Sequence, residues 1–329
     1  MSLDSLLAQR GFLIADGGMG TELFARGLQA GDAPERMNLD APAKVQEVHQ
    51  TYVDVGSDIF LTNSFGCTRL RLALHKLDDR VVELNEAAGR VGRTVADKAQ
   101  REVLVAGSMG PTGELIAPLG GLEFVDAVSA FTEQATGLWR GGVDIIWIET
   151  MSSLHEVEAA VLGTRQVCDL PVAVTLSFDT AGRTMMGVTG TEAAEKLNDL
   201  GVAAMGANCG NNLVDTETAL VEMQAVSNVA VISKANAGIP QWHGSELRYS
   251  GTPEVMAAHA ARMRRSGVVI IGGCCGNTPA HLALVRSVLD GQVAVPEVRA
   301  VDVDTELPAS TNAHKSRSER RERRGRRRR

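Results

Sequence analysis

The stretch FLIADGGMG at residues 12–20 decides the fold, because its pattern returns along the whole chain. A short apolar run ends at Asp16, a glycine-rich turn follows, and a helix is expected from Thr21. Seven later segments repeat this order, with strands expected at 58–61, 103–106, 145–148, 172–176, 202–208, 229–232 and 268–271. Eight such units over about 290 residues predict an α/β fold, a single (β/α)8 TIM-type barrel. A doubly wound open sheet is the alternative, but it would leave strand edges to cover.

The segments between these strands predict the outer helices. They are expected near residues 42–55, 78–98, 124–140, 154–167, 191–200, 216–226 and 253–265, with a last helix from Thr278. In every unit the polar residues follow the carboxyl end of the strand, which is the face on which barrels carry their active sites. That face is therefore expected to gather Asp16, Asn63, Ser108, Glu149, Cys209, Asn236, Cys274 and Cys275.

Composition divides the chain into a barrel domain over residues 1–300 and an Arg-rich, low-complexity tail over 301–329. The net charge of the whole chain is −7, and residues 315–329 hold ten Lys or Arg against two Glu, so the rest of the chain carries about −15. The tail cannot bury a core and is expected to be disordered. The acidic body argues against nucleic-acid binding, except weakly through the basic tail.

No run of eighteen apolar residues and no signal-like apolar core occur, so we expect a cytoplasmic protein with no membrane contact. Five cysteines, an odd number at irregular spacing, favour free thiols or metal ligands over a disulfide framework. Cys67 and Cys168 are interpreted as packing residues. The sequence leaves the oligomeric state open.

Two adjacent cysteines, Cys274 and Cys275, end the last apolar run and are flanked by glycines, which let the backbone approach a metal closely. Cys209 stands in the same setting at the end of another strand. Three thiolates at strand ends predict a zinc site with one position open for water or substrate. An electron-rich sulfur shell suits the activation of an incoming thiol. A structural zinc is the alternative, with Cys67 as the candidate fourth ligand.

An amino-acid thiol would need partners for its ammonium and its carboxylate. Asp16 and Glu149, at the ends of the first and fourth strands, could hold the ammonium. The backbone amides of Gly17, Gly18 and Met19 could form a concave site for the carboxylate.

These motifs together resemble the zinc-dependent homocysteine S-methyltransferase family. The resemblance rests on Asn208-Cys209, on GGCCG at 272–276 and on DGGMGT at 16–21, and it covers residues of about 11 to 290. It implies Cys209, Cys274 and Cys275 as zinc ligands and homocysteine as the substrate. It also implies that Asp16 and Glu149 bind homocysteine and that Asn236 is a weak fourth ligand of zinc before substrate arrives.

The methyl donor is the open question. Residues 107–113, 147–151, 177–179 and 206–210 look most like the bacterial betaine–homocysteine methyltransferase branch, which implies betaine as donor. One departure is Gly66, which stands where animal betaine enzymes carry a tyrosine near the metal. The alternatives are a methylated corrinoid protein, as in a split cobalamin-dependent methionine synthase, or dimethylsulfoniopropionate or S-methylmethionine. A barrel with a structural zinc that serves as a binding module is the alternative of another class.

Overall fold

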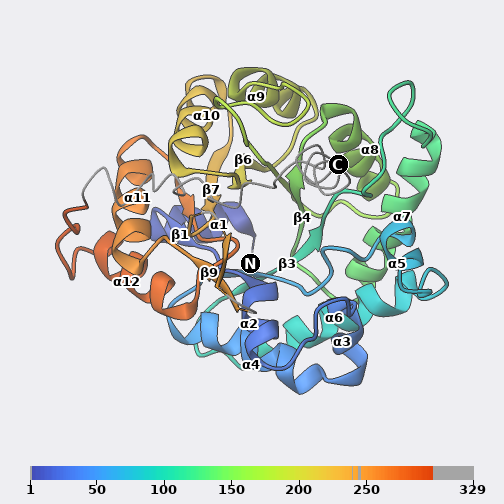
Figure 1. The fold of residues 1–329 in the computed structure, drawn as a ribbon, viewed down its shortest axis with the longest axis horizontal. Coiled ribbons are helices and arrows are strands. Elements are labelled where there is room, and N and C mark those ends of the chain that lie inside the picture. The colour runs from blue at the N-terminus through green and yellow to red at the C-terminus, as the bar shows by residue number, and fades with distance from the viewer. Residues whose placement is uncertain (1, 239, 244–245, 299–329) are drawn as a thin grey trace, which may run out of the picture.

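The computed structural model describes residues 2–238, 240–243 and 246–298. Within them eight parallel strands form one sheet surrounded by helices, as Figure 1 shows. In sheet order the strands are β1 (Leu13–Ile14), β10 (Ile270–Ile271), β7 (Ala230–Ala235), β6 (Ala204–Cys209), β5 (Val172–Leu176), β4 (Ile145–Met151), β3 (Leu104–Met109) and β2 (Ile59–Leu61). The predicted (β/α)8 barrel is confirmed. The predicted domain boundary and tail, from residue 300 on, lie outside the described residues.

The sheet closes on itself between its first and last strands. Ala15, just after β1, forms a parallel bridge to Ile59 of β2. On the far side β6 and β7 pair over six residues, ending with Cys209 opposite Ala235. Because all strands run in the same direction, the segments that follow them meet at one mouth of the barrel.

Eight helices return the chain from the mouth to the start of the next strand or close the domain. They are α4 (Pro42–Asp54), α6 (Val81–Ala96), α7 (Phe124–Arg140), α8 (Leu154–Arg165), α9 (Gly190–Asp199), α10 (Leu213–Val226), α11 (Pro253–Arg265) and α12 (Pro279–Leu289). All occur where the sequence predicts them. Helix α10 begins at Leu213, earlier than the expected residue 216, because the Asn212 side chain caps the helix by accepting from the Asp215 amide.

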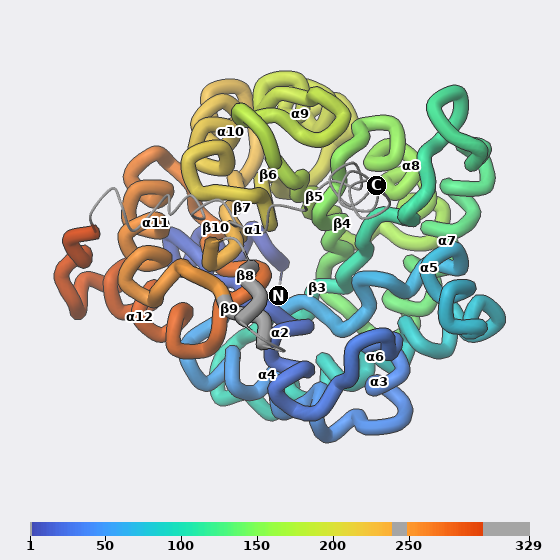
Figure 2. Tube along the Cα trace, in the orientation of Figure 1, coloured from blue at the N-terminus to red at the C-terminus, as the bar shows by residue number. Residues whose placement is uncertain are grey.

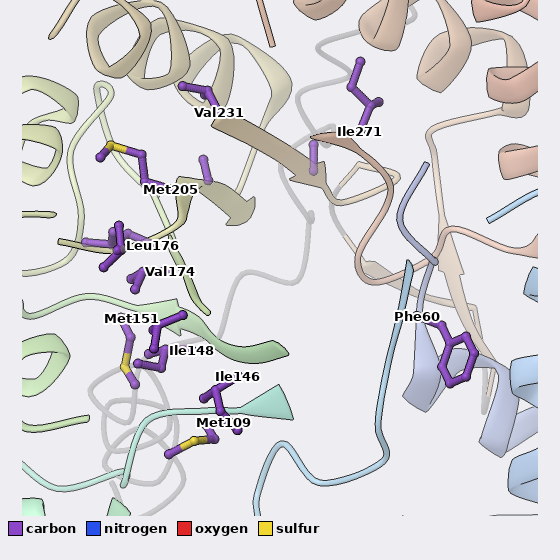
Figure 3. Packing of buried hydrophobic residues seen from close by; sticks show 14 of the residues in the cluster. Phe60, Met109, Ile146, Ile148, Met151, Val174, Leu176, Met205, Val231 and Ile271 are labelled. Atoms are coloured by element: carbon purple, nitrogen blue, oxygen red, sulfur yellow. The ribbon is translucent and has the colours of Figure 1, made fainter. Parts of the chain in front are cut away.

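Two apolar layers hold the barrel together. The inner layer fills the barrel with side chains such as Leu104, Trp147 and Ile232. The outer layer lies between strands and helices, and Figure 3 labels Met109, Ile146, Ile148, Val174, Leu176, Met205 and Val231 among its members. The division follows from the two-residue period of a strand, which sends successive side chains to opposite faces.

Several elements have no counterpart in the predicted pattern. Helix α1 (Leu3–Arg10) precedes the barrel, and its Leu3 and Leu6 pack into the inner layer. Unpredicted short helices lie in the connections after β1 and β2, namely η1 (Pro34–Arg36), α3 (Met37–Asp40) and α5 (Arg69–Ala73). Helix α2 (Met19–Ala25), by contrast, is the helix expected from Thr21. After β7 the chain forms an antiparallel hairpin of β8 (Pro240–His243) and β9 (Glu246–Tyr249), which Figure 2 places inside the outline of the helical ring. No helix in the described ranges is long and apolar enough to span a membrane.

Candidate metal centre

The three cysteines singled out in the sequence come together at the mouth. Cys209 ends β6, and Cys274 and Cys275 follow β10. Their sulfur atoms all lie within 4.8 Å of one another, and Cys209 Sγ is 3.1 Å from Cys274 Sγ. Among the described residues this is the one group of three or more His, Cys, Asp or Glu side chains arranged closely enough to hold a metal ion.

The other two cysteines lie apart from this group. Cys67 is buried in a small apolar cluster with Leu72 and Leu84. Cys168 is half-buried against the outer layer of the barrel. Both are packing residues, as the sequence indicates, and Cys67 is not a fourth member of the group.

The backbone at Cys209 and Gly210 has positive φ angles. Cys209 has a φ of +58°, in the left-handed region that L-residues rarely adopt, and Gly210 follows with +80°. Asn236, just beyond β7, links this turn to the other cysteine loop. Its Nδ2 donates to Gly210 O (3.0 Å), and its Oδ1 accepts from the Cys275 amide (3.0 Å). The predicted ligand Asn236 thus bonds to the backbone of both cysteine loops.

Asn208, next to Cys209, forms a second link. Its side chain accepts from the Thr150 amide (2.8 Å) and donates to Thr150 Oγ1 (2.7 Å), and it also lies 3.8 Å from Cys274 Sγ. Thr150 has a φ of +62°, an outlier for a β-branched residue, beside a register shift in β4. Asn208 therefore stabilises a strained residue of β4, directly after Glu149, and contacts the cysteine group from β6.

Glu149 is a buried carboxyl group close to the cysteines. Ser108 Oγ, on the neighbouring strand β3, donates a short hydrogen bond to Glu149 Oε1. Burial, and next to it the charge of Cys274, raises the pKa of Glu149 to about 8. A cation brought close to Glu149 would stabilise its ionised form, so the site favours a positively charged group there.

Asp16 is engaged by the protein itself. Its Oδ2 accepts from the Leu61 amide (2.8 Å), and its Oδ1 forms an ion pair with Lys234 of β7. Lys234 is almost fully buried, donates also to Asp16 O (3.1 Å) and lies 5.9 Å from the centroid of the Trp147 ring. Burial alone would lower the pKa of Lys234, but Asp16 and then Glu149 outweigh it and raise that pKa.

The glycine turn after β1 is packed against the cysteine loop. The Gly18 amide donates to Asn277 O at 2.9 Å. A Cβ at Gly17 would lie 2.5 Å from the same oxygen, so only glycine fits there. Of the three amides proposed for a carboxylate, the Gly18 amide already has a protein partner.

Comparison with known proteins decides the family. The family model described as homocysteine S-methyltransferase matches residues 13–289, which is nearly the whole described barrel. The chain belongs to the homocysteine S-methyltransferase family. The resemblance inferred from the cysteine and glycine motifs is thereby confirmed.

Relatives of two kinds fit this family assignment. The methionine synthases of Mycobacterium tuberculosis and Mycobacterium leprae are 32% and 31% identical over 86% and 85% of this chain, which spans about a quarter of their length. The crystal structure of the homocysteine methyltransferase MmuM from Escherichia coli, metallated form, superposes with a TM-score of 0.74 at 24% identity, covering 87% of this chain and 99% of that one. At that identity the structural likeness shows the shared fold.

The homocysteine S-methyltransferase family is zinc-dependent in general, and the chemistry of the cysteine group fits zinc. The donor set is three sulfurs from two strand ends, which is the soft set that zinc prefers and one ligand short of a closed structural site. Hydrogen bonds from Cys209 and Cys274 lower the pKa of Cys275, whereas hydrogen bonding to Cys274 raises the pKa of Cys209, so Cys275 is the sulfur that favours the thiolate. The residues present could therefore hold the metal.

Sequence reasoning assigned no role to Lys234 or to the Asn208 side chain. A signal for Lys234 was present, because it is two residues before Asn236 in a strand otherwise made of apolar and small residues. Because side chains alternate between the two faces of a strand, Lys234 and Asn236 are expected on the same face. A lysine buried on that face requires a partner of opposite charge.

Proposed function

We propose that this chain catalyses zinc-dependent methyl transfer from betaine to homocysteine, giving methionine and dimethylglycine. The observation that carries the homocysteine part of the proposal is the group of three sulfurs within 4.8 Å at the barrel mouth, with buried Glu149 close enough for Cys274 to raise its pKa. The choice of betaine rests on the sequence segments 107–113, 147–151, 177–179 and 206–210. A thiol substrate that also bears an ammonium group would match both features. As expected from the five unpaired cysteines, we place the reaction in the cytoplasm.

In this proposal Cys209, Cys274 and Cys275 hold the zinc. When bound, zinc supplies a Lewis acid that keeps the homocysteine thiol deprotonated near neutral pH. Glu149 receives the ammonium, oriented by its hydrogen bond from Ser108.

Asp16 shares the ammonium in this proposal. The amides of Gly17 and Met19 face the carboxylate, because the amide of Gly18, which the sequence also suggested, already donates to Asn277 O. Asn236 remains a proposed weak ligand of the metal before substrate arrives. Its hydrogen bonds to the backbone of both cysteine loops support this proposal, because they hold the side chain between those loops.

The test is methionine formation by the purified chain with homocysteine and betaine, with and without zinc. Activity should require zinc and should be lost in Cys274→Ala, which removes one sulfur ligand. Cys168→Ala is the matched control, because it removes a half-buried thiol outside the metal group and should keep activity. Zinc-independent turnover, or full activity of Cys274→Ala, would contradict the proposal.

The methionine synthase relatives favour a second methyl donor, a methylated corrinoid protein. Those quoted above are methionine synthases several times longer than this chain, so a methylated corrinoid protein could meet the barrel as a separate partner. The donor panel therefore includes betaine, methylcobalamin, a methylated corrinoid protein, dimethylsulfoniopropionate and S-methylmethionine. Turnover with a corrinoid donor and none with betaine would replace betaine in the proposal.

A binding module with a structural zinc makes the opposite prediction about folding. Removing a structural zinc should unfold the barrel, whereas removing a catalytic one should leave the circular dichroism spectrum largely unchanged. We expect the second result, because the barrel has two continuous apolar layers that do not depend on the cysteines.

A further inference from the structure

Lys234 is the one lysine or arginine that is buried among the described residues, and the reaction proposed above gives it no role. It is 2% exposed and belongs to β7, whose last residues reach the mouth of the barrel. Charged side chains are almost never fully buried unless a partner or a ligand requires the charge. Asp16 supplies such a partner, but the contacts of Lys234 go beyond that ion pair.

The Lys234 ammonium also bonds to the backbone beside the glycine turn. Its Nζ donates to Asp16 O (3.1 Å), and the Gly273 amide donates to the same oxygen (2.9 Å). Two donors on one carbonyl oxygen polarise the peptide unit that contains it, which makes the N–H of that unit a stronger hydrogen-bond donor. This N–H is the Gly17 amide, which has no acceptor within the described part of the chain.

The Asp16–Gly17 peptide is trans, so the Gly17 amide points away from the Lys234 ammonium. An acceptor bound to this amide would lie within about 8 Å of the ammonium. Charges at such a distance interact weakly in water, but burial removes much of the screening. Lys234 can therefore attract a negatively charged group at the glycine turn without touching it.

The other ionisable groups at the mouth are acidic. Asp16 and Glu149 are buried carboxyl groups, and the proposed metal site would add three thiolates against the two charges of Zn²⁺. Homocysteine brings a carboxylate of its own, which these negative charges would repel. Lys234 is the buried cation that offsets this repulsion.

We propose that Lys234 is a specificity-determining residue, which makes the mouth accept thiols that carry a carboxylate. It acts through its charge and through the polarised Asp16–Gly17 peptide on a carboxylate that the Gly17 amide binds. The inference rests on the proposed function, because it concerns the carboxylate of homocysteine. An amino-acid thiol would then have Glu149 beside its ammonium and the glycine turn beside its carboxylate.

The test measures how much the carboxylate contributes to binding, with thiols built on the same carbon chain. Homocysteine carries both charged groups, 4-mercaptobutanoate lacks the ammonium, 3-aminopropane-1-thiol lacks the carboxylate, and propane-1-thiol lacks both. Isothermal titration calorimetry gives the dissociation constant of each from the zinc-loaded chain, so no methyl donor is needed. In the wild type we expect 4-mercaptobutanoate to bind about tenfold more tightly than propane-1-thiol.

The variant Lys234→Gln removes the charge and keeps a side chain that can donate to Asp16. We expect it to weaken the binding of homocysteine and 4-mercaptobutanoate about tenfold and not to weaken the binding of the thiols that lack a carboxylate. Lys196→Gln is the matched control, because Lys196 pairs with Glu158 on the surface, and it should change none of the dissociation constants.

Equal weakening of all the thiols in Lys234→Gln would overturn the inference, because that pattern reports a change of structure alone, and so would the absence of any change. Equal binding of 4-mercaptobutanoate and propane-1-thiol by the wild type would also overturn it, and this comparison is valid even if the variant does not fold. Each of these results would leave the proposed function standing. If the zinc-loaded wild type bound none of the thiols, the proposed function would fail together with the inference.

Discussion

Replacing Lys234 by methionine should destabilise the barrel strongly, because it breaks a buried ion pair and leaves one partner uncompensated. The side chains of Lys234 and Asp16 are 2% and 1% exposed. Methionine has a similar length and leaves little cavity, so the main cost is electrostatic. Asp16 would keep only the hydrogen bond from the Leu61 amide.

The size of the effect follows from how buried charges behave. Breaking such a pair from one side typically costs about 3–5 kcal/mol, whereas removing both charges with volume conserved is often close to neutral. We therefore expect Lys234→Met to lose about 3–5 kcal/mol of unfolding free energy. The double variant Lys234→Met with Asp16→Asn should recover all but about 1 kcal/mol of it, because asparagine can still accept from Leu61.

The assay is urea unfolding of the metal-free chain followed by far-ultraviolet circular dichroism, with the slope against urea compared among variants. Lys196→Met is the matched control, because Lys196 pairs with Glu158 on the surface and should contribute little. The reasoning is refuted if Lys234→Met costs less than about 1 kcal/mol, or if the double variant is no more stable than the single one.

Three further predictions concern the site and its surroundings. Glu149→Gln should raise the KM for homocysteine about tenfold or more, because the substrate ammonium would lose its charged partner. The surface variant Glu158→Gln is the control and should leave this KM unchanged. Equal KM values for Glu149→Gln and wild type in initial-rate kinetics would exclude Glu149 from ammonium binding. Burial alone would raise the pKa of Glu217, but hydrogen bonds from His259 and Arg262 lower it to about 2. The folded pKa is below the unfolded one, so this stabilisation should be complete above about pH 4.5 and decline toward pH 2. Urea unfolding should thus show the stability gap between wild type and Glu217→Gln shrinking over that range, and a gap constant with pH would contradict the assignment. Treating the zinc-free protein with a mild thiol oxidant should form a disulfide between Cys209 and Cys274, because their sulfur atoms are 3.1 Å apart. Peptide mass mapping that finds a different disulfide would contradict this arrangement of the sulfurs.

The cysteine group was predictable because each member marks the end of a strand. In a barrel every strand end faces the same mouth, so Cys209 and the pair Cys274 and Cys275 had to be near one another once the fold was known. Glu149 followed from the same rule. The hairpin of β8 and β9 was not predictable in this way, because it interrupts the repeat after β7 and has no helix-forming period of its own.

Asp16 shows where sequence reasoning stops. Its place at the end of β1 was predicted, and the same position made it a proposed partner for the substrate ammonium. The structure adds that Lys234, 218 residues further along the chain, already occupies one of its oxygens. The pattern around Lys234 indicates a buried partner, but nothing local to either residue identifies Asp16 as that partner.

The sequence by itself determined the order of strands and helices and the set of polar residues that reach the mouth, because both follow from local periods of two and of about 3.6 residues. Only the tertiary structure decided which of those residues touch. The ion pair of Lys234 with Asp16 and the contact of Asn208 with Cys274 join elements far apart in the chain. Such contacts depend on the closure of the barrel and on the path of the hairpin, which are set by packing over the whole domain.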